Sequence, residues 1–393
     1  MRWLLLLSSL TAGSLWAQDP LSIASRLRVA LPEAIEEKDP SKTVVQFVTN
    51  RLLLGAAKGQ PAWHTMVPDH KILLRATENP LAGYVVVKHD GTPDVENNAS
   101  LKPYSIDSFH PMYKVKLGRN EDLLPPTTNE VADTGLSFLK NYWSRDVVIL
   151  IHGYNNSWET VIRRAAQLKR DLRKKHKRDF AMLVYSWPSL GSGGLMSILE
   201  YTDDERRYRQ SIPAFATFLE ASLLKDGSTA GRGKRWVIAH SMGNRMFLHG
   251  LAEMGRRKEA AKEKLPHDLF TRIVLAAPDM EVEDFDVHTK YAFQFCASPK
   301  PLMYFHATSN VAVQVSEFEH LDDRAGVKPV VSDKLLTIDA KAAKSPLSEI
   351  GHGYYASNDR MVALIADYFF DGADPSKDPQ LESLDGGKRW KLK

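Results

Sequence analysis

The chain has little cysteine and little excess charge. Cys296 is the single cysteine among 393 residues, so no intramolecular disulfide can form and the fold must depend on packing. Its apolar neighbours favour an inert buried thiol. Basic and acidic residues nearly balance, 52 against 48, so nothing favours a polyanionic partner and we expect no nucleic-acid binding. The histidines have no metal-ligand spacing, and no metal or cofactor is predicted.

A long apolar run occurs only at the N-terminus. Met1-Arg2-Trp3 precedes a leucine run and small residues up to Ala17, which predicts a signal peptide over residues 1–17. The protein is therefore expected to be periplasmic or secreted. The run is short for a bilayer crossing, so no stable membrane span is expected after its removal. An uncleaved anchor is the alternative, because Leu15 is larger than the residue usual near a cleavage site.

The remaining chain divides into three parts by pattern. Residues 18–140 contain short β-rich runs and predict an extension packed on the sheet. Residues 141–370 alternate apolar strands with amphipathic helices, which is typical of βαβ units and a mostly parallel sheet with helices on both faces. Residues 371–393 are charged and rich in Gly, Pro and Ser, and predict a disordered tail.

The expected elements are as follows. Strands of the extension are predicted at 43–49, 71–75, 83–88 and 112–117, and strands of the core at 147–151, 181–186, 236–240, 273–277, 302–306 and 335–339. A helix with core residues from Trp158 to Leu172 follows the first core strand, with Asn156 and Glu159 as a capping pair. The basic run 169–178 at its end is interpreted as a solvated face.

The strand at 236–240 breaks into a helix at Ala239-His-Ser-Met-Gly243. A small-x-Ser-x-Gly sequence between a strand and a helix indicates a nucleophile elbow, which makes Ser241 the candidate nucleophile. Ala239 stands where glycine is usual. The alternative is a core serine at a helix N-cap.

Parallel strands end at a common edge of a sheet, so the catalytic partners of Ser241 are expected just after the ends of the other strands. The strand at 147–151 is followed by Gly153, and we predict that the backbone N–H groups of Tyr154 and Met242 form an oxyanion hole. His352, between two glycines after the last strand, is the predicted general base and acid. His240 competes with it, but a residue next to the serine points away from it.

The acid of the triad is less defined. Asp279 ends the strand after that of the serine, and neighbouring strands lie only about 4.8 Å apart. We therefore predict that its carboxylate lies about 2.6 to 3.2 Å from the far ring nitrogen of His352. A structural turn residue is the alternative role for Asp279, and the other candidate acids are Asp284, Asp286 and Glu317.

Five motifs in this order resemble the bacterial α/β-hydrolase family DUF900, over about residues 47–369. They are His152-Gly-Tyr-Asn-Asn-Ser157, Tyr185-Ser-Trp-Pro-Ser189, Ala239-His-Ser-Met-Gly-Asn244, Leu275-Ala-Ala-Pro-Asp279 and Gly351-His352. The resemblance implies an α/β-hydrolase fold and an esterase- or lipase-like serine hydrolase with the order serine, acid, histidine. An aspartate usually follows the strand that here leads to Asn310. Either Asp279 supplies that charge, or the enzyme is weak or retired.

We therefore expect a serine hydrolase that cleaves carboxylic esters, small-molecule or lipid-like, through an acyl-serine intermediate. Two alternatives stay open: a catalytically impaired hydrolase fold that acts as an envelope-associated binding module, and amide or peptide hydrolysis by the same triad. The glycine-rich segment 187–201 either borders the acyl pocket or packs as a plain loop, and no large lid is expected.

Overall fold

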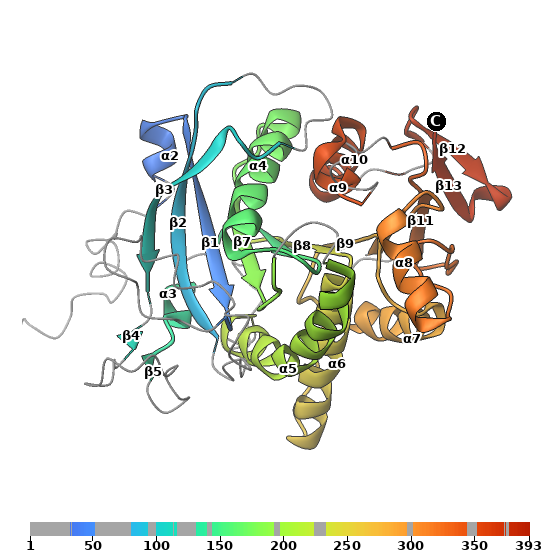
Figure 1. Ribbon diagram of the computed structural model, residues 1–393, viewed down its shortest axis with the longest axis horizontal. Coiled ribbons are helices and arrows are strands. Elements are labelled where there is room, and N and C mark those ends of the chain that lie inside the picture. The colour runs from blue at the N-terminus through green and yellow to red at the C-terminus, as the bar shows by residue number, and fades with distance from the viewer. Residues whose placement is uncertain are drawn as a thin grey trace, which may run out of the picture.

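The computed structural model contains one large sheet and one small one (Figure 1). It describes residues 32, 34–51, 80–92, 100–112, 114–115, 131–139, 144–191, 197–223, 233–296, 302–343, 352–372, 374 and 377–393. The large sheet has eleven strands in the order β12-β13-β11-β10-β9-β8-β6-β7-β1-β2-β3. Its strands are β1 (Lys42–Thr49), β2 (Leu81–His89), β3 (Tyr104–Pro111), β6 (Val147–Ile151), β7 (Ala181–Ser186), β8 (Arg235–His240), β9 (Arg272–Ala276), β10 (Leu302–His306), β11 (Leu335–Asp339), β12 (Leu381–Leu384) and β13 (Arg389–Leu392). The small sheet pairs β4 (Lys114–Val115) with β5 (Val131–Asp133).

The direction in which strands are added reverses at β6. From β6 the chain adds β7 on one side, and then returns to add β8 to β11 on the other side, all in parallel. Such a reversal leaves a crevice beyond the carboxyl ends of β6 and β8, because the connecting helices leave on opposite faces. The antiparallel strands β2 and β3 extend the sheet beyond β1, which itself pairs in parallel with β7.

Helices cover both faces of the sheet (Figure 1). The strands are buried on both faces, so they read as continuous apolar runs: Trp236 and Ile238 of β8 join one core cluster, and Val237 and Ala239 join the other. The first cluster includes residues of α4 (Trp158–His176), α9 (Tyr354–Ser357) and α10 (Asp359–Phe370), and the second includes residues of α3 (Leu136–Leu139), α5 (Ser197–Leu223), α6 (Gly243–Ala260), α7 (Val282–Ala292) and η4 (Phe293–Phe295). The remaining helices are α2 (Ala34–Lys38), α8 (Val311–His320) and η7 (Asp385–Gly387).

The predicted strands agree with the structure almost throughout. All six core strands, together with β1 and β2, are present within two residues of their expected ends. The expected strand at 71–75 lies outside the described residues, as does the signal peptide, and only 114–115 of the strand at 112–117 is described as strand. The sequence pattern did not predict β3. The N-cap of α4 is Ser157, whose hydroxyl accepts from Thr160 N at 3.1 Å, and not Asn156.

The disordered tail predicted for 371–393 is wrong. Residues 381–392 form a hairpin in which β13 pairs in parallel with β11 and β12 pairs antiparallel with β13. Leu381 and Leu392 are buried in the core and Trp390 packs against it, while the charged residues between them point outward. Gly386 and Gly387, both with positive φ, make the turn. Apolar and polar residues alternate on either side of a central Gly-Gly, a pattern that indicates a hairpin. The many charged residues of the segment favoured the prediction of disorder instead.

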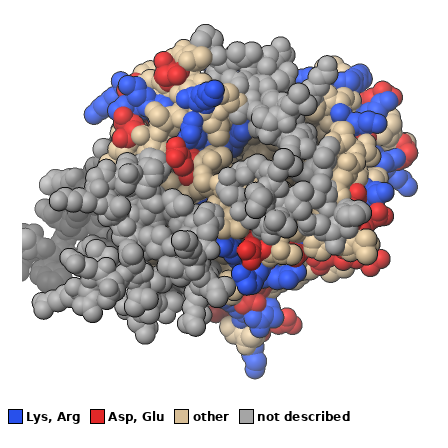
Figure 2. All heavy atoms as spheres, in the orientation of Figure 1, with Lys and Arg blue, Asp and Glu red and all other residues tan. Residues whose placement is uncertain are grey.

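The basic run 169–178 is not only a solvated face. Lys169 is fully buried, and its ammonium binds Glu36 Oε1 at 2.6 Å and the carbonyl of Val44 at 2.9 Å. Arg173 binds the other carboxylate oxygen of Glu36 at 2.6 Å. Helix α4 is therefore tied to α2 and β1 by an ion pair closed to solvent. Elsewhere acidic and basic side chains are interspersed over the described surface that Figure 2 shows.

No helix in the described part of the chain combines the length and the apolarity that a membrane crossing requires.

Glu36→Ala should lower the free energy of unfolding by about 3 to 5 kcal/mol, because it leaves Lys169 as a buried charge without its carboxylate. Urea unfolding of the two variants Glu36→Ala and Glu37→Ala measures this. Glu37 is exposed and serves as the control, with an expected change within about 0.5 kcal/mol. Equal effects of the two changes would contradict the buried ion pair.

Candidate active site

Ser241 lies at the sharp turn between β8 and α6. Its backbone is left-handed, with φ of 54°, a conformation that is costly for a residue other than glycine and that collects at functional sites. The turn is fixed by hydrogen bonds from Ser241 N to the carbonyl of Ala276 at 2.9 Å and from Asn244 Nδ2 to the carbonyl of Ser241 at 2.9 Å. The structure therefore has the elbow that the sequence predicts, and Ala239 fits without a glycine.

Two glycines let the end of β6 approach this turn. A Cβ at Gly153 would lie 2.7 Å from Cβ of Ser241 and 3.2 Å from its hydroxyl oxygen. A Cβ at Gly243 would lie 2.5 Å from the carbonyl oxygen of His152. Neither position has room for a methyl group. The loop after β6 is thus held directly against the serine.

The two predicted oxyanion donors, the N–H groups of Tyr154 and Met242, directly follow Gly153 and Ser241, the residues that meet in this contact. Met242 immediately precedes α6, where the first backbone N–H groups have no acceptor within the helix. Tyr154 follows Gly153 in the loop, and its ring packs edge-on against Tyr201 with centroids 5.5 Å apart. A helix N-terminus and a neighbouring loop amide are the usual donors for negative charge at such a turn.

A buried carboxylate holds that loop in place. Asp204 on α5 accepts hydrogen bonds from Asn155 N at 2.9 Å, from the hydroxyl of Ser189 at 2.6 Å and from Leu190 N at 3.0 Å. Asn155 has a left-handed backbone, with φ of 55°. Burial raises the pKa of Asp204, against these hydrogen bonds, which lower it.

Arg51, at the end of β1, holds the same loop from the other side. Its guanidinium is fully buried and donates to the carbonyl of Asn156 at 2.8 Å, the carbonyl of Ser189 at 2.8 Å and the hydroxyl of Ser186 at 2.9 Å. Burial lowers the pKa of Arg51 to about 9, against the charge of Asp204, so the group stays cationic at neutral pH. The sequence search assigned no role to Arg51 or Asp204.

His352 lies against the elbow, in front of α9. The carbonyl of His352 accepts a hydrogen bond from His240 Nε2 at 3.0 Å, and the two rings are 4.5 Å apart. Its Nδ1 lies 3.0 Å from Oδ1 of Asn310. Since an amide oxygen only accepts, Nδ1 carries the hydrogen and Nε2 carries the lone pair. Among the described residues Nε2 is buried without a hydrogen-bond partner, and no hydrogen bond joins it to Ser241.

The surroundings of His352 keep it neutral. Burial lowers the pKa of His352 to about 4, against the charge of Asp279, which raises it. His240 is likewise held neutral, since burial and the nearby His352 lower its pKa well below the usual range. The ring of His240 stacks on Tyr355 at 4.4 Å, so it positions the loop of His352 and does not compete for the serine.

Asp279 does not make the hydrogen bond that the sequence analysis expected. His352 Nδ1 pairs with Asn310, and the carboxylate oxygens of Asp279 accept from Tyr201 at 2.6 Å and from Ser316 at 2.6 Å. Arg245 lies 3.3 Å from Asp279 Oδ1. Burial raises the pKa of Asp279, but the charges of Arg245 and Arg324 and the hydrogen bonds from Ser316 and Tyr201 together outweigh burial and lower the pKa. The buried arginine on α6 therefore draws this carboxylate away from the imidazole.

The other candidate acids also have partners elsewhere. Asp284 contacts His249 and His288, Asp286 pairs with Lys290 at 2.5 Å, and Glu317 accepts from Arg324 N at 3.1 Å. Asn310 thus occupies the acid position, where it also accepts from Val313 N as the N-cap of α8. Cys296 is half-buried, and burial raises its pKa to about 12, which favours an unreactive thiol.

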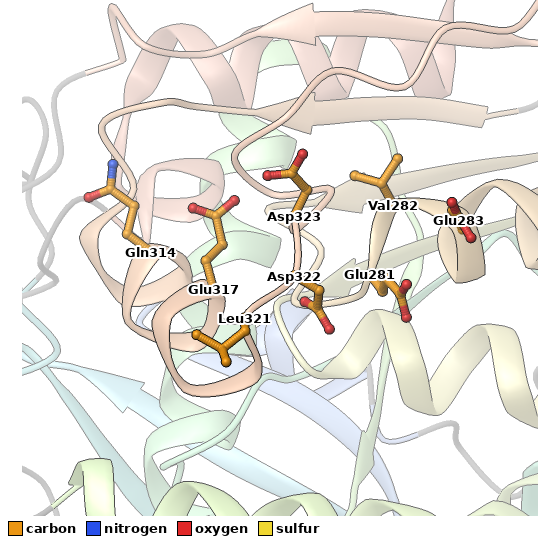
Figure 3. A pocket seen from close by; sticks show the side chains of 8 residues that line it. All are labelled: Glu281, Val282, Glu283, Gln314, Glu317, Leu321, Asp322 and Asp323. Atoms are coloured by element: carbon orange, nitrogen blue, oxygen red, sulfur yellow. The ribbon is translucent and has the colours of Figure 1, made fainter.

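A cavity of about 710 Å³ lies between α7 and α8, and it is lined by neither Ser241 nor His352 (Figure 3). Five of its eight lining residues are carboxylates, with Val282, Gln314 and Leu321 as the others. An acidic cavity repels the oxyanion of an ester intermediate, so we do not assign it to the substrate. Residues 192–196 of the glycine-rich segment lie outside the described residues.

A serine presented by a strand-to-helix elbow at the reversal point of a parallel sheet, with a histidine after the last strand of the core, defines an α/β hydrolase. The chain belongs to the family described as alpha/beta hydrolase of unknown function (DUF900), which matches residues 130–367, more than half of the sequence. This match confirms the resemblance but begins later than residue 47, so β1 to β3 precede it. No curated protein and no solved structure matches the chain.

Asp204→Ala should lower the free energy of unfolding by about 3 kcal/mol, because it leaves two backbone N–H groups and one hydroxyl without their acceptor and Arg51 without its nearest counter-charge. Thermal and urea unfolding measure the loss. Asp203→Ala is the matched control, since Asp203 is half exposed and pairs only with exposed Arg206, and should change stability by about 0.5 kcal/mol or less. A loss no larger than that of the control would contradict the role of Asp204.

Proposed function

We propose that the protein is a serine hydrolase that cleaves carboxylic esters through an acyl-serine intermediate. The observation that carries this proposal is the buried Nε2 of His352, which has no hydrogen-bond partner among the described residues and belongs to a loop that His240, the neighbour of Ser241, holds by a hydrogen bond. An imidazole nitrogen that is buried without a hydrogen-bond partner costs free energy, and such a cost is usually retained for function.

The chemistry follows from the tautomer and the donors. Ser241 Oγ attacks the ester carbon while His352 Nε2 takes its proton, and the carbonyl oxygen becomes an oxyanion next to the amides of Met242 and Tyr154. The imidazolium then gives the proton to the leaving alcohol, and an acyl-serine forms. Water repeats the sequence, which releases the acid and restores the serine. The serine-histidine contact is open in the free protein, as catalytic hydrogen bonds often are before substrate binds.

The substrate class is argued from charge and position. The nearly balanced net charge of +4 gives no reason for a polyanionic substrate, and we propose a small or lipid-like ester. The signal peptide predicted for residues 1–17 is the reason to propose a periplasmic or secreted location for the reaction. Amide or peptide hydrolysis would use the same groups, but the neutral Asn310 disfavours it, because Asn310 supplies no charge to stabilise the imidazolium that forms on the way to expelling a poor leaving amine.

Ser241→Ala should abolish labelling by a fluorophosphonate probe and lower kcat for p-nitrophenyl esters by about 10⁴-fold or more, because it removes the nucleophile. Ser105→Ala, at an exposed position on β3, should leave both unchanged and serves as the control. Covalent labelling read by intact-protein mass spectrometry is the measurement. Labelling that survives the loss of Ser241 hydroxyl would refute the proposal.

Asn310 favours a second candidate function, a catalytically impaired hydrolase fold that serves as an envelope-associated binding module. An amide orients the imidazole but carries no charge to stabilise the imidazolium, and the same loss of charge costs a serine protease roughly 10⁴ in kcat. The charge of Asp279 compensates in part, because it acts on His352 through space.

Asn310→Asp should raise kcat/KM at pH 8 by about 10-fold or more, because a carboxylate stabilises the imidazolium. The general base must be neutral, so kcat/KM rises with pH through the pKa of His352. The wild type should therefore be flat above about pH 5, given a pKa of about 4, and the variant should lose activity from a higher pH downward.

Asp279→Asn is the comparison. It should lower kcat/KM less than Asn310→Asp raises it, since Asp279 does not touch the ring. Turnover in Asn310→Asp alone, with none in the wild type, would support the impaired module. Loss of all activity in Asp279→Asn at unchanged Tm, with no gain in Asn310→Asp, would make Asp279 the acid instead.

A further inference from the structure

We propose that His249, Asp284 and His288 form a Zn²⁺ site that joins α6 to α7. His249 lies on α6, and Asp284 and His288 lie one turn apart on α7, so two helices contribute donors to one point. None of the three belongs to the candidate active site. The sequence search predicted no metal, because only tertiary structure brings His249 to the other two residues.

The donor atoms already converge. His249 Nε2 lies 3.1 Å from one carboxylate oxygen of Asp284, and His288 Nδ1 lies 3.0 Å from the other. His288 Nδ1 also lies 2.9 Å from the backbone carbonyl of Asp284, and metal binding would replace that hydrogen bond. The ligand atoms of all three residues lie within 4.8 Å of one another. In a tetrahedral zinc site with bonds of about 2.0 to 2.2 Å the donors lie about 3.4 Å apart, so the two imidazole–carboxylate distances would lengthen slightly and any separation near the 4.8 Å limit would close by up to about 1.4 Å.

The type of donor selects the metal. Two imidazole nitrogens with one carboxylate are typical ligands of zinc and are poor ligands for Ca²⁺ or Mg²⁺, which prefer sets of oxygen atoms. Three protein donors leave a fourth position for water. All three residues are half-buried, so an ion can enter from solvent while the carboxylate is partly shielded from it.

The cluster combines one carboxylate with two imidazoles, and a proton on His288 would compete with a metal for the site. Hydrogen bonds from His249 and His288 hold the pKa of Asp284 well below its usual range, so the carboxylate is ionised. The same carboxylate raises the pKa of His288. The ring of Tyr208 on α5 also packs on His249, with centroids 5.9 Å apart. A metal would replace the proton of His288, and binding should therefore weaken as pH falls.

The second cluster of this kind among the described residues is less suitable. His176 Nε2 lies 2.5 Å from Asp367 and its Nδ1 lies 3.3 Å from Asp371. The two nitrogens of one ring point in different directions, so a single ion cannot bind between both carboxylates and the ring. Asp371 is also exposed. In the cluster of His249 each imidazole instead faces its own oxygen of one shared carboxylate.

The metal would connect the helix that begins beside Ser241 to α7. His249 lies six residues after Gly243, about 9 Å along α6, so the ion would be remote from the serine and would stabilise the helix pair. This inference does not depend on ester hydrolysis, and either can fail without the other.

The test is titration of the full chain, freed of metal by chelator, with ZnCl₂ at pH 7.5 in a calorimeter. We expect a site with Kd of about 1 μM or below, and a Tm that rises by several degrees when free zinc is about 100 times Kd. His249→Gln and His288→Gln should each weaken binding at least 10-fold. Asp284→Asn, which keeps the shape of the carboxylate, should do the same.

His267→Gln, on an exposed loop, and His176→Gln, in the other cluster, are the matched controls and should retain the affinity. Circular dichroism of the metal-free variants separates lost binding from lost folding, and the Tm shift of the wild type tests the site without any variant. Absence of binding at 100 μM zinc, unchanged affinity in all three cluster variants, or loss in His176→Gln alone would each overturn the proposal.

Discussion

The close approach of the β6 end to the β8–α6 turn is the constraint on which the site depends. Gly153 and Gly243 leave no room for a side-chain carbon, and through them the loop of Tyr154, the hydroxyl of Ser241 and the amide of Met242 share one small volume. The buried ionic groups Arg51 and Asp204 hold that loop from β1 and α5. The N-terminal strands, which precede the family match, therefore contribute directly to the geometry of the candidate oxyanion hole.

Charge in the site is arranged around a histidine that is kept neutral. His352 meets the amide of Asn310, and the nearest buried carboxylate, Asp279, is taken up by Arg245, Tyr201 and Ser316. An amide fixes the tautomer as well as a carboxylate does, but it gives no electrostatic stabilisation to the protonated ring. The ring of His352 is thus oriented by a neutral amide, and the buried carboxylate of Asp279 belongs to a separate hydrogen-bond network.

Most of the fold was predictable because burial on both faces makes each parallel strand an unbroken apolar run. Errors arose where charge hid a pattern. The hairpin of β12 and β13 carries charged residues on its outer face, and Lys169 was interpreted as solvated although Glu36 neutralises it. In the site, Ser241 and His352 could be predicted from the residues next to them in the chain. Arg51 and Asp204 could not, because their partners are distant in sequence and no local motif indicates them.

The sequence by itself determined the elbow, the order of strands along the chain and the place of the histidine after the last core strand. The reason is that turn glycines and runs of apolar residues set the local structure within a few residues. Tertiary structure alone decided which polar group meets His352. Asp279 follows β9, which pairs with the strand of Ser241, and Asn310 follows β10, one strand further along the sheet; Asp279 is held by the buried Arg245, and Asn310 meets the ring. Electrostatic pairing between residues distant in sequence has no period or local composition, so only the assembled core could reveal it.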